Sequence, residues 1–343
     1  MAVRLIYNHI AHHARCSGYD QLAKYVNGEA YVQEGLPNKL AESISWKRIR
    51  NMPYYRSAWY GGPALRREIE ICVRMLVPQR TIYHFLYAEN DLRCTSLWRL
   101  RWNNKIVGSF HQPPEFLDAH VEDKRYIKGA SAAVVMSQSQ VSFLEQFLPA
   151  KRIYHVPHGV DTKYWCPDPA VPRWEHPTFL VVGQWLRDIE MIVATARAME
   201  TAEPSARFHV VTFKEHAAQF EGLSNTKVMS GIPDARLLEE NRRCLALFLP
   251  LKLATSNNAV LEAMACGTTV VSTRSGGTPE YVDDTGILVE PGDVDGAIAA
   301  LRSLIADRDL AERLGRKARE RTQTHYSWEV VGEQMNVAYR DIL

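Results

Sequence analysis

Glu262 is the charged residue whose place in the sequence points most directly to chemistry. It lies in an apolar, helix-compatible stretch, residues 259–265, that follows Asn257 and stops at Gly267. Asn is a good helix N-cap and Gly commonly ends a helix, so we expect a helix of about ten residues. A carboxylate about one and a half turns into such a helix is costly to bury without a partner. We therefore predict that Glu262 faces a ligand cleft and accepts hydrogen bonds of the kind that a ribose diol donates; a solvated glutamate on an amphipathic helix is the alternative.

Two predicted strands must position this helix. Residues 245–249 form an apolar run and residues 268–272 are rich in β-branched side chains, as expected of buried parallel strands. A loop containing Gly276 and Gly277 follows the second strand. Ligands of such βαβ units bind beyond the carboxyl ends of the strands, where the helix N-terminus at Asn257 and Asn258 favours an anionic group.

The same stretch carries a family resemblance. The run NNAVLEAMACGTTVVSTRSGGTPEYVDDTGILVEPGD resembles the donor-binding signature of the family 4 glycosyltransferases, glycosyl transferases group 1. That signature is E-x7-E-A-M-A-x-G-x-P-V-V, then Gly-Gly-x-x-Glu, which matches Gly276, Gly277 and Glu280. The resemblance implies an α/β, GT-B fold, in which two Rossmann-like doubly wound domains face each other across a cleft. It also implies retaining transfer from a nucleotide sugar, with no metal and no cofactor.

The chain departs from that signature at two positions. Ala254 stands where the family usually has the first Glu, and Thr269 stands where Pro is common. The first Glu is usually placed beside the transferred sugar or the diphosphate. Because this chain lacks that Glu, a non-catalytic GT-B scaffold or binding subunit is the alternative function. A sugar-nucleotide epimerase on the same fold has no supporting feature.

The resemblance also implies further site residues. Gly183, Gln184 and Arg187 follow the predicted strand 178–182, where the family grips the donor's phosphates with Gly-Arg and a later Lys. Arg187 is the cation available in that loop, and Arg makes bidentate contacts with phosphate. Ile232 lies in a turn whose backbone usually faces the nucleotide base.

Two more candidates come from the first half of the chain. Gly18 lies in a loop that crosses the cleft in the resembling family. His111 follows the predicted strand 105–110 directly, where a family His lines the sugar site. With Glu262, His111 is our candidate catalytic residue; the usual alternative for a lone His is a structural role.

Length and composition fit a protein of two domains. The chain has 343 residues with 46 % hydrophobic and 23 % charged residues, which is ordinary for globular proteins. We expect an acceptor-side domain at 1–166, a donor-binding domain at 167–325, and a terminal helix, 326–343, that returns to the first domain. No apolar run approaches ~18 residues and no signal-peptide core is present, so the expected location is cytoplasmic. The six widely spaced cysteines fit reduced thiols.

Charge is divided unevenly along the chain. Residues 1–165 hold 22 Lys and Arg against 14 Asp and Glu, and the remainder holds 19 against 25. The basic segment 46–80, interleaved with Trp and Tyr, has three interpretations: a solvated face, a surface that contacts an anionic membrane peripherally, or a nucleic-acid surface, which no motif supports. We expect a glycan, lipid-linked or small-molecule acceptor on this domain and no nucleic acid.

Two possible metal sites are not supported by their context. The histidines at 9, 12 and 13 have no Asp, Glu or Cys cluster beside them. Asp293 and Asp295 form a D-x-D, but it follows Pro-Gly and precedes a predicted helix, which favours an N-cap. The donor's base is open, with a slight preference for UDP over GDP.

Overall fold

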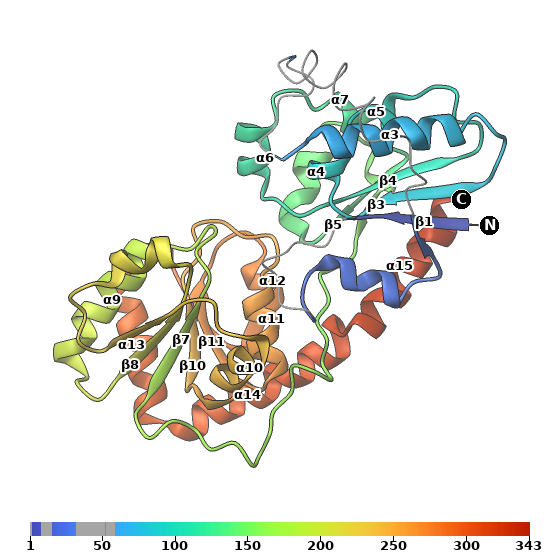
Figure 1. Ribbon diagram of the computed structural model, residues 1–343. Helices are drawn as coiled ribbons and strands as arrows, with labels where there is room; N and C mark the ends of the chain where they lie inside the picture. The colour runs from blue at the N-terminus through green and yellow to red at the C-terminus, as the bar shows by residue number, and fades with distance from the viewer. Residues whose placement is uncertain (1, 8–15, 32–51, 53–58) are drawn as a thin grey trace. The chain divides into compact units, whose positions relative to one another are not determined.

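The computed structural model describes residues 2–7, 16–31, 52 and 59–343 (Figure 1). The chain divides into two compact units. Unit 1 contains residues 19–158, the first strand and residues 331–343. Unit 2 contains residues 159–330 and the short segment that ends at Gly18. Residues 46–51 and 53–58 of the basic segment, and the three N-terminal histidines, lie outside the described residues.

Unit 1 is built on a six-stranded parallel sheet with the order β2-β1-β3-β4-β5-β6. Its strands are β1 (Ala2–Ile6), β2 (Glu29–Ala30), β3 (Thr81–Phe85), β4 (Lys105–Phe110), β5 (Ala132–Val135) and β6 (Ile153–His155). β3 and β5 are buried along their whole length. That fits strands covered on both faces, the usual state of an all-parallel sheet.

Most of the described helices of unit 1 are short; α3 (Gly62–Arg74) and α15 (Trp328–Ile342) are the longer ones. The short helices include the 3₁₀ helix η1 (Tyr19–Lys24), α4 (Ala88–Asp91), α5 (Cys94–Leu97), α6 (Pro114–His120), α7 (Arg125–Gly129) and α8 (Val141–Leu144). The long α15 belongs to this unit from Val331 onward. There the Oδ1 of Asn336 accepts the backbone N–H of Asn27 at 2.8 Å.

Unit 2 is a second six-stranded parallel sheet, with the order β12-β11-β10-β7-β8-β9. Its strands are β7 (Thr178–Val182), β8 (Arg207–Val211), β9 (Thr226–Met229), β10 (Ala246–Leu249), β11 (Thr269–Thr273) and β12 (Ile287–Val289). The strand order runs outward in one direction from β7 to β9 and in the other from β10 to β12. Its topological switch point therefore lies between β7 and β10.

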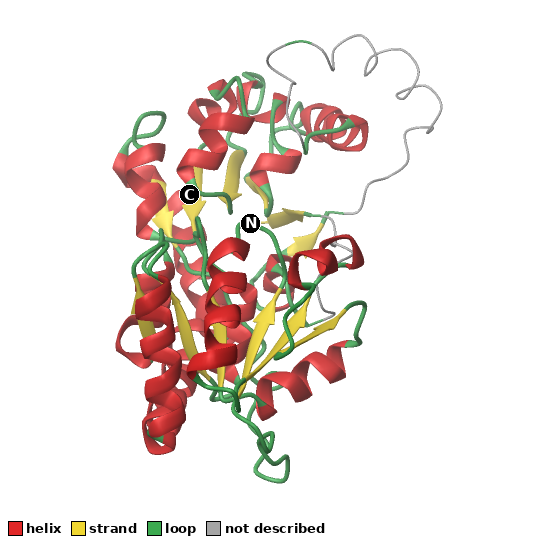
Figure 2. Cartoon of the chain, turned by 90° about the vertical axis from the view of Figure 1, so that its left-hand side faces the viewer, coloured by secondary structure: helices red, strands yellow, loops and turns green. Residues whose placement is uncertain are grey.

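Helices lie on both faces of the sheet in unit 2 (Figures 1 and 2). They are α9 (Ile189–Ala202), α10 (Asp234–Arg243), α11 (Asn258–Ala265), α12 (Thr278–Val282), α13 (Val294–Ala306) and α14 (Arg308–Arg321). The predicted α/β class with two doubly wound sheets is confirmed. None of the described helices combines the length and the apolar character that crossing a bilayer requires.

Candidate functional site

Two loops meet at the switch point of unit 2. One follows β7 and contains Arg187; the other follows β10 and contains Leu251, and these two residues form an antiparallel bridge. The backbone N–H of Asp188 donates to Pro250 O at 2.9 Å, and the N–H of Lys252 donates to Leu186 O at 2.9 Å. The structure thus fixes the post-β7 loop against the post-β10 loop at the edge where parallel sheets bind ligands.

Arg187 is held in place by its own loop. Its Nη1 donates to Trp185 O at 2.7 Å and its Nε to Val182 O at 3.1 Å. Burial lowers the pKa of Arg187 to about 10, an effect that the charge of Glu262 opposes. The guanidinium therefore stays charged at neutral pH, with its position set before any ligand arrives.

Gly183 allows this placement. Its φ is +78°, a left-handed conformation that favours glycine. A Cβ added there would lie 3.1 Å from Nη2 of Arg187. Any larger residue would thus press on the guanidinium as well as strain the backbone.

The N-terminus of α11 lies beside Arg187, as the sequence indicated. The side chain of Asn257 accepts the backbone N–H of Val260 at 3.3 Å and so caps the helix, and the helix stops before Gly267, whose φ is +70°. Nη2 of Arg187 approaches Oδ1 of Asn257 to 3.5 Å. One partly buried cation and the positive end of a helix beginning at Asn258 thus converge, which suits a phosphate group.

The Gly-Gly loop after β11 packs on the loop after β10. The N–H of Gly277 donates to Ala254 O at 3.0 Å. Gly276 has a φ of +50°, and a Cβ there would come within 1.9 Å of the same oxygen. Because Ala254 is only 6 % exposed, the position where the family usually has its first Glu is filled by a tight backbone contact.

Glu262 is buried, not solvated. It is 5 % exposed, and Oγ of Ser17 donates a hydrogen bond to its Oε1. Burial raises the pKa of Glu262 to about 8, and the charge of Asp234 adds to that rise while Arg187 opposes it. The carboxyl group thus already receives a hydroxyl of the type that a ribose would offer. Sequence analysis missed Ser17, although this residue directly precedes the candidate Gly18, which is buried with a φ of +100°.

The remaining candidates of unit 2 occupy neighbouring loops. Oε1 of Gln184 accepts the hydroxyl of Thr212 at 3.0 Å, so Gln184 links the loops after β7 and β8. Ile232 is partly buried between β9 and α10. Glu280 lies in the first turn of α12, and its carbonyl accepts Nη2 of Arg321 at 2.8 Å. These contacts tie the candidates to the framework of the loops and give none of them a ligand role by themselves.

His111 belongs to unit 1, at the carboxyl end of β4. Its Nε2 lies 2.7 Å from Leu86 O, and its backbone N–H donates to a carboxylate oxygen of Glu89, which is 2 % exposed. Tyr19 packs edge-on against its ring at 4.6 Å and Tyr87 lies at 4.8 Å. Burial lowers the pKa of His111 to about 4, so the imidazole is neutral at pH 7 and Nε2 carries the proton that Leu86 O accepts.

Glu89 is a residue that the sequence analysis missed. It follows β3 within the short α4 and also accepts the N–H of Gln112 at 2.8 Å. A carboxylate just after a predicted strand was a signal that could have identified it. Its contacts fix the backbone at His111 and do not touch the imidazole.

The D-x-D behaves as a helix cap. Oδ1 of Asp293 accepts the backbone N–H of Gly296 at 2.8 Å, and Asp293 is the N-cap of α13. The expected capping role of Asp293 is confirmed.

Comparison with known proteins agrees with this geometry. Residues 190–321 match the family described as glycosyl transferases group 1. The GDP-mannose-dependent alpha-(1-6)-phosphatidylinositol monomannoside mannosyltransferase of Mycolicibacterium smegmatis is 26 % identical over 219 residues, 56 % of this chain and 57 % of that protein. Among the strongest sequence matches, the aligned segments span between 16 % and 57 % of the relatives' own length.

Solved structures share the fold over nearly the whole chain. Sucrose-phosphate synthase from Thermosynechococcus elongatus has a TM-score of 0.71 at 19 % identity, covering 99 % of this chain and 98 % of that one. HepE of Anabaena, solved in complex with UDP-glucose, has a TM-score of 0.70 at 13 % identity, covering 99 % and 100 %. The protein has a GT-B-like fold. The match to the glycosyl transferases group 1 family covers residues 190–321, which lie in unit 2.

Proposed function

We propose that this protein is a retaining glycosyltransferase that moves a sugar from a nucleotide-sugar donor to a glycan, lipid-linked or small-molecule acceptor. The observation that carries the proposal is the convergence of Arg187 with the N-terminus of α11 at the switch point of unit 2. A nucleoside diphosphate is the leaving group of such a transfer. Positive groups fixed before reaction stabilise the charge that develops on it, which is usually a large part of catalysis.

The candidate residues have separate roles in this proposal. Arg187, Gly183 and the amides at Asn257 and Asn258 bind the diphosphate. Glu262 binds the ribose. A ribose hydroxyl either replaces the hydroxyl of Ser17 as the donor to Oε1 of Glu262 or donates to the carboxyl group beside it.

Further contacts complete the donor site in this proposal. Gln184, Ile232, Gly276, Gly277 and Glu280 line the donor, and Gly18 approaches it. His111 contacts the sugar or the acceptor as a neutral imidazole.

The donor's base is the less defined part of the proposal. The Mycolicibacterium relative is named for GDP-mannose, whereas HepE was solved with UDP-glucose. We favour a UDP-sugar, in agreement with the preference drawn from the sequence.

A non-catalytic binding subunit is the second candidate, favoured by one observation. Ala254 replaces the first Glu of the family signature, and its buried carbonyl is used by Gly277. Such a subunit would bind nucleotide without turning it over.

A nucleotide-sugar panel tests the proposal. Thermal unfolding of the purified chain is followed with UDP- and GDP-sugars, the free diphosphates and the nucleosides. A ligand at about 100 times its dissociation constant stabilises by roughly 2.7 kcal/mol, which raises the melting temperature measurably. The expected result is stabilisation by one base class of nucleotide sugar; stabilisation by none of them at millimolar concentration would contradict the proposal.

A further inference from the structure

A basic hollow lies at the amino edge of the sheet in unit 1, away from the candidate site. It measures about 510 Å³ and is lined by Arg101, Lys105, Lys151 and Arg152, together with Asp341. An adjoining hollow of about 370 Å³ shares two of these arginines and adds Arg99 and Lys128. Lys105 is the first residue of β4, and Lys151 and Arg152 directly precede β6. The cations are therefore gathered at the ends of the strands opposite to His111.

These cations are not neutralised by the protein. Within the part of the chain that the structure describes, none of the six forms an ion pair, and the acid lining the hollow, Asp341, accepts the hydroxyl of Tyr154 at 2.6 Å. Nη1 of Arg101 donates to the carbonyls of Gly129 at 2.9 Å and Ser96 at 3.3 Å. Burial and the nearby charge of Arg152 both lower the pKa of Arg101. Two guanidinium groups thus lie near each other, and neither forms an ion pair with a carboxylate among the described residues.

Large apolar side chains are exposed beside the hollow. Leu100 is 62 % exposed, Trp102 65 % and Leu97 42 %. Nε1 of Trp102 donates to Leu76 O at 2.9 Å, which joins this group to the end of α3, where Leu76 and Val77 are 45 % and 55 % exposed. Contiguous exposed apolar residues of this size indicate an interaction site rather than ordinary surface.

One turn presents both kinds of side chain. In the sequence Leu100-Arg101-Trp102 the outer two residues are exposed and the middle one lines the hollow. Trp102 has a φ of +49°, an uncommon conformation for a bulky residue and one that costs energy. The backbone therefore keeps Trp102 on the surface at a cost, immediately beside the cations.

We propose that this amino-edge surface binds anionic bilayers, with lipid phosphates in the basic hollow and Leu100 and Trp102 in the headgroup region. A bilayer uses both features at once, because interfacial Trp and Leu side chains and clustered Lys and Arg are what membrane-surface proteins present. A soluble phosphate compound would use the cations and leave the exposed apolar side chains unexplained.

The contact would leave the candidate site of this unit accessible. β4 runs from Lys105 to Phe110, and His111 follows it, so the two edges are separated by roughly 20 Å along the strand. A membrane on the amino edge does not cover His111. The inference is independent of the donor proposal, since vesicle binding requires neither nucleotide nor turnover.

Sedimentation with vesicles tests this surface. The full chain is mixed with phosphatidylglycerol-containing or pure phosphatidylcholine vesicles at low and at high salt. It should pellet with the anionic vesicles at low salt and much less in the other conditions. Replacing Lys105, Lys151 and Arg152 by Gln should weaken vesicle affinity roughly 100-fold. Replacing Leu100 and Trp102 by Ser should reduce binding that persists at high salt.

Two matched variants remove the same charge elsewhere. The first replaces Arg197, Arg302 and Arg308, exposed cations of unit 2, by Gln and should bind vesicles as the unmodified chain does. The second replaces Lys47, Arg48 and Arg50 of the basic segment by Gln; release by this variant but not by the amino-edge variant would overturn the inference. Failure to bind anionic vesicles would also overturn the inference. That conclusion would stand even if the hollow bound inorganic phosphate in calorimetry or a single-stranded oligonucleotide in a shift assay.

Discussion

In the proposed donor site, Arg187 has both a structural and a binding role. Two of its nitrogens hold backbone carbonyls of its own loop, which leaves Nη2 directed toward Asn257. An arginine with its geometry fixed in this way loses little side-chain entropy when a phosphate binds. The family's Gly-Arg and following Lys are thus replaced here by one arginine whose position is set by its own loop.

Replacing Arg187 by Ala should weaken binding of the nucleoside diphosphate by about 1.5–3 kcal/mol, the usual contribution of a charged hydrogen bond, and leave the nucleoside nearly unaffected. Calorimetric titration with both ligands measures the difference. Because the arginine also supports its loop, Arg187→Lys, which keeps the charge, should recover part of the affinity. Arg274→Ala removes an exposed cation at the same sheet edge, paired with Glu290, and serves as the control; equal losses for nucleoside and diphosphate in Arg187→Ala would refute the assignment.

Glu262 makes stability depend on pH in a defined direction. Its pKa is raised from 4.5 to about 8, chiefly by burial. A raised pKa means that the folded chain holds the proton more tightly than the unfolded chain. The stabilisation is complete below about pH 4.5 and is lost as pH rises through about 8.

The Glu262→Gln variant has no carboxyl group at this position, so its stability does not fall when that group loses its proton. Its melting temperature relative to the unmodified chain should therefore increase steadily between pH 5 and pH 9. Glu290→Gln, a change at an exposed carboxylate, should show no such trend. Parallel pH profiles for the unmodified chain and Glu262→Gln would mean that the carboxyl group is not protonated in the folded state.

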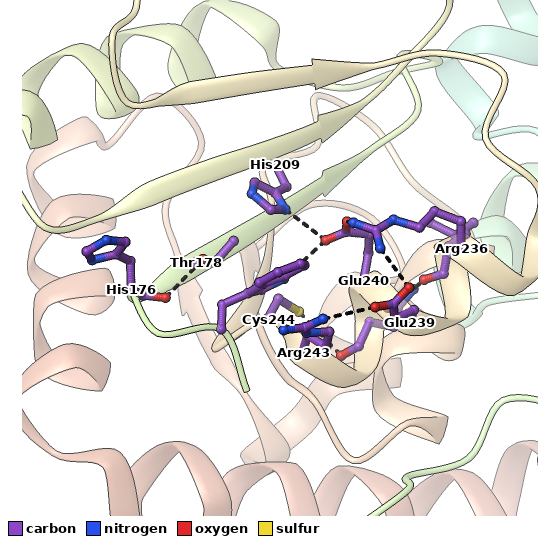
Figure 3. Close-up of polar contacts among 11 residues, drawn as sticks. His176, Thr178, His209, Arg236, Glu239, Glu240, Arg243 and Cys244 are labelled. Atoms are coloured by element: carbon purple, nitrogen blue, oxygen red, sulfur yellow. Dashed lines mark hydrogen bonds and ion pairs between the residues drawn. The ribbon is translucent and has the colours of Figure 1, made fainter. Parts of the chain in front are cut away.

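At the scale of elements, a polar cluster joins α10 to β8 and to the segment that precedes β7 (Figure 3). Glu240 is fully buried on α10, and Nδ1 of His209 lies 2.8 Å from its Oε2. Nε1 of Trp174 donates to the same oxygen at 3.3 Å, and the guanidinium of Arg243 stacks 3.5 Å over the Trp174 ring. This cluster anchors residues 174–178 at the start of β7, and hence the strand that carries the Arg187 loop.

Glu240→Ala should lower the free energy of unfolding by about 1–3 kcal/mol, because it removes a fully buried carboxylate and leaves its partly buried partners His209 and Trp174 without their acceptor. Glu239→Ala, one residue away, breaks partly exposed ion pairs with Arg236 and Arg243 and should cost at most about 1 kcal/mol. Urea unfolding of the two variants provides the comparison. Similar losses of unfolding free energy in the two variants would show that the buried Glu240 stabilises the protein no more than the partly exposed Glu239 does.

Local signals predicted the elements well, and long-range contacts escaped them. The cap at Asn257 and the helix end at Gly267 follow from residue types a few positions apart, and both predictions were confirmed. The contact between Ser17 and Glu262 joins residues 245 positions apart, and no periodicity or turn signal encodes it. The amino-edge hollow likewise collects side chains from four stretches of the chain, within 101–105, at 131, within 151–154 and at 341–342.

At the scale of the whole molecule, the features singled out above lie at three separate sheet edges. The carboxyl edge of unit 2 gathers Arg187 and the α11 N-terminus, and the carboxyl edge of unit 1 carries His111. The amino edge of unit 1 carries the basic hollow. In the proposals made above, donor binding, acceptor contact and membrane attachment therefore use different residues.

The last prediction distinguishes an enzyme from a binding subunit. The full chain, incubated with the donor that stabilises it most, should release free nucleoside diphosphate by transfer to an acceptor or slowly to water. That release should persist in EDTA, because Asp293 of the D-x-D is used to cap α13, and Arg187 with the α11 N-terminus is positioned to neutralise the leaving diphosphate. Release that stops on chelation and returns with Mn²⁺ would contradict the metal-independent mechanism. Tight donor binding with no release in either condition would instead favour the non-catalytic subunit, and would identify Ala254 as the first position at which to restore a Glu.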